Sequence, residues 1–226
     1  MITKDNLRNL LVCLGFQQSE DAQDVMHLYF DKIDCTVAVD FTNEKIFYPE
    51  GVEADRDTTK NFSANENFVV LECVVGLLTQ GYKPENIVLE PKTPGGREDS
   101  HFYCDILIRD NDKRPYMLIE CKTMDGKEDD EFNKAWKKTL HDGGQLFNYY
   151  NTYRQAQYLA LYASDFVDGE LRCSYRLITM TDNKEYLESN PKLLSFEKVS
   201  ADNGTRDDFF KVWSETYGKD YATNGA

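Results

Sequence analysis

Apolar residues recur at helical spacing in four stretches of the chain. This pattern predicts helices over residues 5–14, 63–80, 130–153 and 206–217. In the second predicted helix, Ser63 is placed as the N-cap and Glu66 follows three positions later, which is the sequence of a capping box. Gly81 lies where a C-cap glycine is expected. Gly143 and Gly144 weaken the middle of the third predicted helix.

Short apolar runs and alternating stretches predict the strands. They cover residues 35–47 as a hairpin, followed by 86–90, 102–108, 116–121, 157–163 and 171–180. Residues 51–60 and 91–100 predict loops, and residues 164–170 predict a turn. From residue 63 onward the order is helix, three strands, helix, two strands. This order predicts an α/β fold with a central mixed β-sheet flanked by helices.

The chain is expected to form one domain with three parts. Residues 1–62 are an N-terminal helical and hairpin extension, residues 63–180 are the core, and residues 181–226 are a C-terminal helical segment. With 226 residues, 41% of them hydrophobic, the chain is long and apolar enough to bury a core. No apolar run is long enough to span a membrane, and no secretory signal is visible. Six scattered cysteines without a CxxC pair favour a reduced, cytoplasmic protein.

The charge of the chain bears on whether a nucleic acid can be its partner. The formal net charge of −14 taken alone argues against a nucleic-acid partner. Residues 113–138, however, contain seven Lys or Arg and six Asp or Glu, so this stretch is close to neutral. The acidic total therefore does not exclude DNA, and it suggests weak DNA affinity for this chain alone.

Three ionisable residues stand inside otherwise apolar strand sequences, namely Asp105, Glu120 and Lys122. Burying such charges without partners costs several kcal/mol, roughly, so they are expected to meet each other or a metal. Glu120 and Lys122 share one face of a strand because side chains alternate, and a neighbouring strand would bring Asp105 beside them. Two carboxylates suit Mg²⁺, which can activate a water for attack on a phosphodiester. A structural ion pair at a strand end is the simpler interpretation of the three residues alone.

The spacing of these residues resembles a known signature. Asp105 followed by Glu120-Cys121-Lys122 is similar to the D…(D/E)xK motif of the PD-(D/E)xK nuclease superfamily. Residues 145–149, Gln-Leu-Phe-Asn-Tyr, resemble the QxxxY motif of its RecB-like branch. Upstream, Asn65-Glu66 opens a helix similar to the glutamate-bearing first helix of the endonuclease domain in the R subunit of type I restriction-modification enzymes. The resemblance covers residues 63–164.

This resemblance implies a restriction-endonuclease-like core and a role for each matched position. Asp105 and Glu120 would bind Mg²⁺, with the carbonyl of Cys121 as a further ligand, and Lys122 would be the catalytic lysine. Glu66 would add a carboxylate near the metal, with Glu72 of the same helix as the alternative. Gln145 and Tyr149 would orient the DNA or the site. Cys104 stands where the motif has Pro, which is one departure from the pattern.

The resemblance also implies double-stranded DNA as the substrate, and methyltransferase and specificity subunits as partners. The chain has no GxxxxGK[ST] phosphate loop, so ATP would bind only the full-length subunit and the chain is expected to be a fragment. A stand-alone nuclease is another interpretation. A third is a catalytically inactive docking or regulatory module. It is suggested by an aromatic stripe in the last predicted helix (Phe209, Phe210, Trp213 and Tyr217), for which core packing is the simpler explanation. An acidic DNA mimic would leave the buried charges unexplained.

Overall fold

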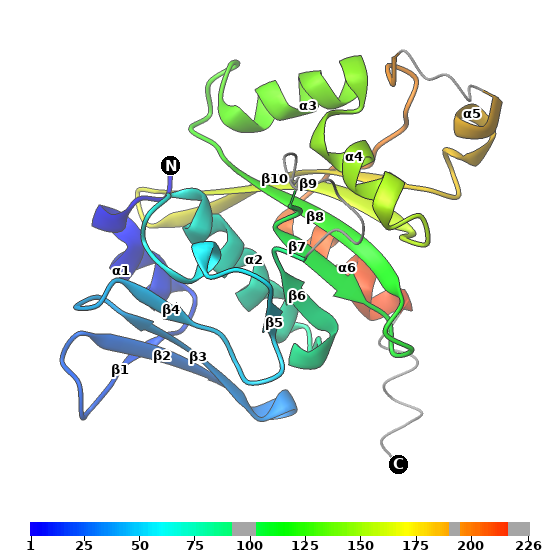
Figure 1. The fold of residues 1–226 in the computed structure, drawn as a ribbon. Coiled ribbons are helices and arrows are strands. Elements are labelled where there is room, and N and C mark those ends of the chain that lie inside the picture. The colour runs from blue at the N-terminus through cyan, green and yellow to red at the C-terminus, as the bar shows by residue number, and fades with distance from the viewer. Residues whose placement is uncertain (92–102, 190–194, 217–226) are drawn as a thin grey trace.

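The computed structural model describes residues 1–91, 103–189 and 195–216, with side chains through residue 212 in the last segment. A six-stranded sheet in the order β10-β9-β8-β7-β6-β5 forms its centre (Figure 1). The strands are β5 (Glu53–Ala54), β6 (Ile87–Leu89), β7 (Ile106–Arg109), β8 (Pro115–Thr123), β9 (Tyr158–Val167) and β10 (Glu170–Thr179). The β8–β9 and β5–β6 pairs are parallel and the other pairs are antiparallel. This mixed sheet with helices on its faces confirms the predicted fold class.

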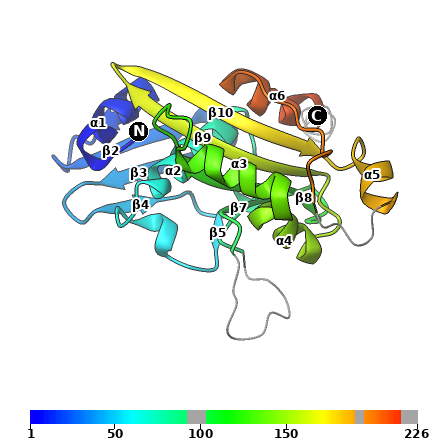
Figure 2. The same cartoon turned by 90° about the horizontal axis from the view of Figure 1, so that it is seen from above.

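Helices cover both faces of this sheet (Figures 1 and 2). One hydrophobic core joins the sheet to α1, α2 and α6, and a second core joins its other face to α3 and α4. The helices are α1 (Lys4–Cys13), α2 (Glu66–Thr79), α3 (Glu131–Asp142), α4 (Gly144–Thr152), α5 (Lys184–Ser189) and α6 (Arg206–Thr216). Strand β8 serves both cores, because Ile119 and Cys121 pack on the α2 side while Leu118 packs on the α3 and α4 side.

Helix α2 is the most deeply buried helix. All of its residues from Asn67 to Leu78 are buried, as expected for a helix that is apolar on all sides. Its Gly76 lies against the ring of Phe210 in α6, and Phe209 and Phe210 are fully buried. The aromatic stripe is therefore core packing at these two positions, while the side chain of Trp213 and all of Tyr217 lie outside the described residues. No helix in the described ranges combines the length and apolar character needed to cross a membrane.

A second, four-stranded antiparallel sheet is formed by the N-terminal residues. It contains β1 (Gln17–Gln18), β2 (Val25–Phe30), β3 (Cys35–Asp40) and β4 (Lys45–Phe47), in that order. The predicted hairpin over residues 35–47 is confirmed as β3 and β4, whereas β1 and β2 were not predicted. Met26, Val37 and Val39 point from this sheet into the core that contains α2. The extension thus shares a core with the central sheet.

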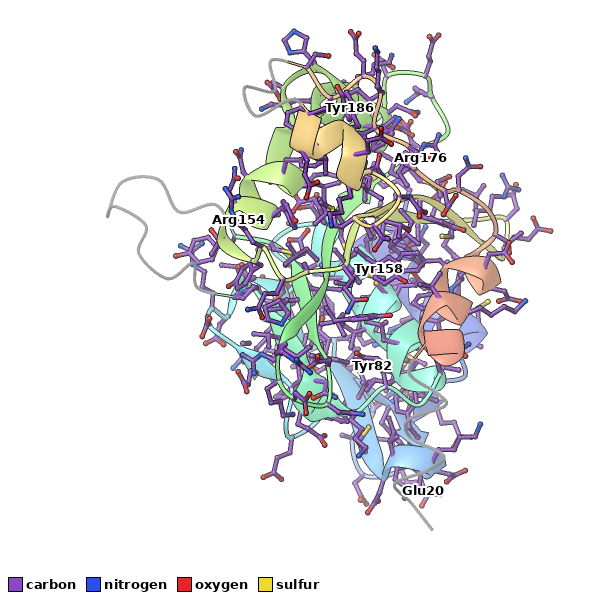
Figure 3. All side chains as sticks on the ribbon, turned by 90° about the vertical axis from the view of Figure 1, so that its right-hand side faces the viewer. Glu20, Tyr82, Arg154, Tyr158, Arg176 and Tyr186 are labelled. Carbon is purple, nitrogen blue, oxygen red and sulfur yellow. The ribbon has the colours of Figure 1, made fainter. Side chains whose placement is uncertain are left out.

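Strand β10 is the edge of the central sheet beside α3. Arg176 of this strand is labelled in Figure 3. Its guanidinium lies 5.6 Å from the ring centroid of Phe132 and 5.9 Å from that of Trp136. Such cation–π contacts tie the edge strand to the helix above it. Where β8 and β9 begin, the rings of Tyr116 in β8 and Tyr158 in β9 lie 5.2 Å apart.

The single helix predicted over residues 130–153 is wrong. Two helices, α3 and α4, occupy this stretch and meet at Gly143, whose φ of +86° is left-handed. Glycine adopts this conformation without the steric penalty of a side chain. A Cβ atom at Gly143 would lie 2.7 Å from the ring of Phe196, so the junction of the two helices is tightly packed.

The predicted capping box at Ser63 is also wrong. Helix α2 begins at Glu66 with Asn65 in the N-cap position, because the backbone N–H of Ser63 donates to the side chain of Asn61 (2.9 Å) and holds Ser63 in a bend before the helix. The prediction at the other end is confirmed, since Gly81 has a φ of +87° directly after the helix.

Three boundaries between strands and loops differ from the prediction. Strand β5 lies inside the predicted loop 51–60 and pairs in parallel with β6. Strand β9 continues to Val167 through the predicted turn 164–170, because the polar side chains of Ser164 and Asp165 are buried in the sheet. Strand β7 begins at Ile106, so Asp105 precedes the strand. The predicted loop 91–100 lies outside the described residues beyond residue 91.

Candidate active site

The candidate site lies where β8 extends beyond the start of β7. Ile106 of β7 pairs with Ile119 of β8, and the residues of β8 that follow have no β7 partner. Asp105 precedes this last pair, and its Oδ2 accepts a hydrogen bond of 2.7 Å from the backbone N–H of Cys121. The carboxylate thus replaces the carbonyl that a longer strand would have supplied.

Lys122 joins two carboxylates at this point. Its Nζ donates to Glu120 Oε1 at 2.6 Å and to Glu66 Oε2 at 3.2 Å. Glu120 and Lys122 share one face of β8, whereas Glu66 is the first residue of α2. The structure therefore brings together Glu66, Glu120 and Lys122, with Asp105 bonded to the same segment of β8.

Burial and mutual charge shift the pKa values of Asp105, Glu120 and Lys122. Only 2% of Glu120 is exposed, and burial raises its pKa while Lys122 opposes the rise. Burial, followed by the charge of Glu120, raises the pKa of Asp105 well above its usual range. Burial disfavours the charged form of Lys122, yet the carboxylates of Glu120, Asp105 and Glu66 outweigh it and raise the lysine pKa. The site therefore contains a lysine that holds its proton strongly beside two carboxyl groups, those of Asp105 and Glu120, that resist ionisation.

The donor atoms fit a hard cation such as Mg²⁺. Glu120 Oε2 is buried and has no hydrogen-bond partner among the described residues, so one carboxylate oxygen is free for a ligand. The side chain of Cys121 packs in the core with α2, which leaves only its backbone on the side of Asp105. Within the described ranges no three His, Cys, Asp or Glu side chains are grouped to hold a metal. Mg²⁺ needs only one or two protein carboxylates and completes its shell with waters and substrate phosphate.

The two residues of the QxxxY match lie on α4 and contact each other. Gln145 Nε2 donates to the Tyr149 hydroxyl at 3.0 Å, and this hydroxyl donates to the carbonyl oxygen of Tyr103 at 2.5 Å. Tyr149 is buried, and burial together with the charge of Glu120 raises its pKa. The pair thus holds the backbone two residues before Asp105. No sequence signal marked Tyr103, because it takes part through its backbone carbonyl.

Glu72, the alternative helix carboxylate, lies elsewhere. It is fully buried, accepts a hydrogen bond of 2.7 Å from the Tyr162 hydroxyl, and pairs with Arg206 Nε at 2.6 Å. This cluster connects α2 to β9 and α6. Glu66 is therefore the carboxylate of α2 that contacts Lys122.

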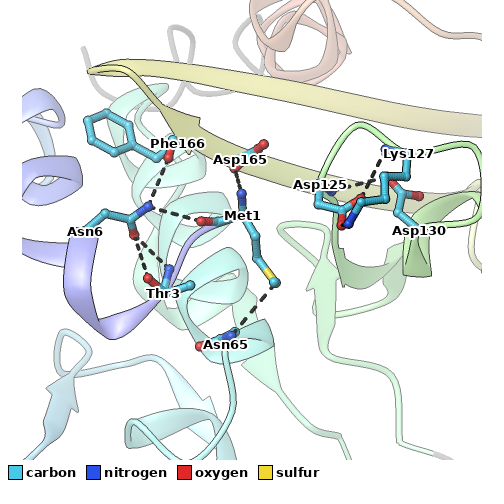
Figure 4. A network of polar contacts seen from close by, with 9 residues as sticks. All are labelled: Met1, Thr3, Asn6, Asn65, Asp125, Lys127, Asp130, Asp165 and Phe166. Carbon is cyan, nitrogen blue, oxygen red and sulfur yellow. Dashed lines mark hydrogen bonds and ion pairs between the residues drawn. The ribbon is translucent and has the colours of Figure 1, made fainter.

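The N-terminal residues fasten the beginning of α2 (Figure 4). Asn65, which precedes Glu66, donates to Met1 Sδ at 3.9 Å, and the ammonium group of Met1 pairs with the buried carboxylate of Asp165 in β9. Asn6 donates from Nδ2 to the carbonyl oxygens of Phe166 (3.0 Å) and Met1 (3.1 Å). These contacts tie α1 and β9 to the end of α2 that carries Glu66.

Comparison with protein families supports the interpretation drawn from the motifs. Residues 73–161 match the family of the type I restriction enzyme R protein N terminus. The match confirms the resemblance over a segment that contains Asp105, Glu120, Lys122, Gln145 and Tyr149. It begins after Glu66, so the contact of that residue with Lys122 is what relates it to the site. No curated protein matches the chain.

Proposed function

We propose that this chain is the Mg²⁺-dependent DNA endonuclease domain of a type I restriction enzyme R subunit. The observation that carries the proposal is the meeting of Asp105, Glu120 and Lys122 at the open end of β8. In this proposal Asp105 and Glu120 hold Mg²⁺, with the carbonyl of Cys121 as a further ligand. When bound, the ion supplies Lewis acidity that activates water and stabilises negative charge on the phosphodiester.

The protein residues have separate tasks in this proposal. Lys122 stays charged beside its carboxylates and donates hydrogen bonds that orient the attacking water and a phosphate oxygen. Glu66 fixes the position of the Lys122 ammonium group. Gln145 and Tyr149 fix the backbone before Asp105 and so set the direction of its carboxylate. We further propose double-stranded DNA as the substrate, and methyltransferase and specificity subunits as partners, with ATP used outside this chain.

The test is DNA cleavage by the assembled restriction complex carrying Asp105→Asn, Glu120→Gln or Lys122→Met. Each variant is expected to lose more than about a hundredfold in cleavage rate, since each removes a ligand or the positioned cation. Lys4→Met is the matched control, because Lys4 is an exposed lysine paired with Glu44 away from the site. It should cut at the wild-type rate. Wild-type cleavage by all three site variants would overturn the proposal.

A further inference from the structure

Arg56 carries an exposed guanidinium group next to the candidate site. The guanidinium carbon lies 4.0 Å from the centroid of the Tyr103 ring, which is the distance of a cation–π stack. Within the described ranges no carboxylate forms an ion pair with Arg56, whereas nearby Lys60 is paired with Asp57 at 3.0 Å. Arg56 is thus an oriented cation that forms no ion pair with a carboxylate of the described residues.

The loop that carries Arg56 is anchored on two sides. On one side the buried carboxylate of Glu90 accepts hydrogen bonds from the Thr58 hydroxyl and from the backbone N–H of Thr59 (3.3 Å). On the other side Asn67 Nδ2 donates to the carbonyl oxygens of Thr58 (2.7 Å) and Asn61 (2.9 Å). A loop fixed in this way holds its side chains with little loss of conformational entropy when a ligand binds.

Glu90, Asn67 and Tyr103, which hold the Arg56 loop, are each connected to the candidate site. The backbone N–H of Glu90 donates to the carbonyl oxygen of Asp105 at 3.0 Å, and Asn67 directly follows Glu66. Tyr103 stands two residues before Asp105, so their Cα atoms are at most about 7 Å apart. Its carbonyl oxygen also accepts the Tyr149 hydroxyl. The Arg56 loop therefore belongs to the same rigid framework as Glu66 and Asp105.

We propose that Arg56 binds a phosphate of the DNA backbone beside the phosphate that is cut. This inference rests on the proposed nuclease function and adds a positioning residue to it. A guanidinium presents parallel donors that match two phosphate oxygens, and stacking on Tyr103 fixes its plane before DNA arrives. Binding at this place would hold the duplex in register with Asp105, Glu120 and Lys122.

Arg8 offers a matched control within the chain. It also stacks on an aromatic ring, that of Phe41, with 3.9 Å between the guanidinium carbon and the ring centroid. Its guanidinium, however, is paired with Asp24 at 2.7 Å, and it lies on α1 beside the N-terminal sheet. Arg8→Gln therefore removes the same charge and a similar stack without removing a residue of the site framework.

The experiment measures binding of a fluorescein-labelled duplex to the full chain by fluorescence anisotropy over a series of salt concentrations, without divalent cation. One lost phosphate contact lowers the slope of log affinity against log salt by about 0.9. We expect this decrease for Arg56→Gln, a slope close to wild type for Arg56→Lys, and no change for Arg8→Gln. Retention of the slope by Arg56→Lys excludes general damage to the loop.

Three results would overturn the inference. They are a wild-type slope for Arg56→Gln, an equal decrease for Arg8→Gln, and no salt-dependent binding of the duplex by the wild-type chain. The proposed nuclease function is tested separately, by measuring DNA cleavage by the wild-type restriction complex and by the complex that carries Lys122→Met. An unchanged slope together with a Lys122-dependent cleavage would reject the role of Arg56 and leave the nuclease proposal standing.

Discussion

The Asp105 carboxylate accepts a hydrogen bond of 2.7 Å from the backbone N–H of Cys121, which lies between Glu120 and Lys122 in the chain. This contact joins the segment before β7 to the strand that carries the other two residues of the motif. Because β7 begins only at Ile106, no strand carbonyl is available to this N–H on that side. Asp105 therefore has a structural task as well as its proposed metal-binding task.

Substitutions at Asp105 should separate these two tasks. Asp105→Asn keeps an oxygen acceptor for the Cys121 N–H, and its free energy of unfolding should stay within about 1 kcal/mol of wild type. Asp105→Ala leaves a buried N–H without a partner and should lose about 1–3 kcal/mol. Urea unfolding measures both values. Equal stability of the Ala and Asn variants would show that the hydrogen bond has no structural importance.

The raised pKa values of Asp105 and Glu120 predict how Mg²⁺ binding depends on pH. Without metal, Asp105 and Glu120 of the folded protein keep their protons above about pH 4, where the same groups of the unfolded chain lose them. The contribution of these groups to the free energy of unfolding therefore decreases as the pH rises from about 4 to their folded-state pKa values. Mg²⁺ requires the charged carboxylates, so its affinity should fall as pH is lowered. Added Mg²⁺ should therefore raise the unfolding temperature more near pH 8 than near pH 5, because carboxyl groups with raised pKa values keep more of their protons at the lower pH. Glu120→Gln is the control and should show a smaller shift, and an equal Mg²⁺ effect at both pH values would contradict the prediction.

The buried pair of Glu72 and Arg206 should stabilise the docking of α6. Glu72 is fully buried, so Arg206→Met leaves a buried carboxylate without its cation and should lower the free energy of unfolding by about 3–5 kcal/mol. Lys4→Met breaks an exposed ion pair with Glu44 and should cost less than about 1 kcal/mol. Chemical denaturation of the two variants gives the comparison. Similar losses for both would mean that burial of Glu72 does not govern the effect.

Close packing of α2 against α6 depends on Gly76. A Cβ atom at this position would lie 2.2 Å from Phe210 Cζ, so Gly76→Ala must displace the ring. Overpacking should outweigh the higher helix propensity of alanine and give a net loss of about 1–2 kcal/mol. Adding Phe210→Leu, which shortens the side chain, should recover part of this loss in thermal unfolding. A Gly76→Ala variant more stable than wild type would contradict the observed contact.

The sequence predicted much of the central sheet because its strands are apolar runs bounded by turn residues. The alternation rule also placed Glu120 and Lys122 on one face correctly, and the Lys122 contact selects Glu66 over Glu72. Local patterns failed where tertiary contacts decide. Ser63 is held in a bend by Asn61, and Ser164 and Asp165 continue a strand because both are buried.

Arg56 is a further position at which tertiary contacts, and not the local sequence pattern, decide the arrangement near the site. Its sequence neighbours are polar and without a period, so residues 51–60 indicated only a loop. The stack on Tyr103 and the hydrogen bond to Glu90 join residues that are 47 and 31 positions apart along the chain. The two hydrogen bonds from Asn67 join residues that are 9 and 6 positions apart. No single-sequence pattern encodes such pairings.

The most direct test of the nuclease assignment is a single assay of the assembled restriction complex carrying Lys122→Met, with DNA cleavage and ATP hydrolysis measured in the same sample. Lys122 contacts Glu66 and Glu120 and no other described carboxylate by an ion pair, so its loss should be confined to this site. We predict that cleavage falls more than about a hundredfold while ATP hydrolysis stays at the wild-type rate. Cleavage at the wild-type rate by this variant would contradict the account.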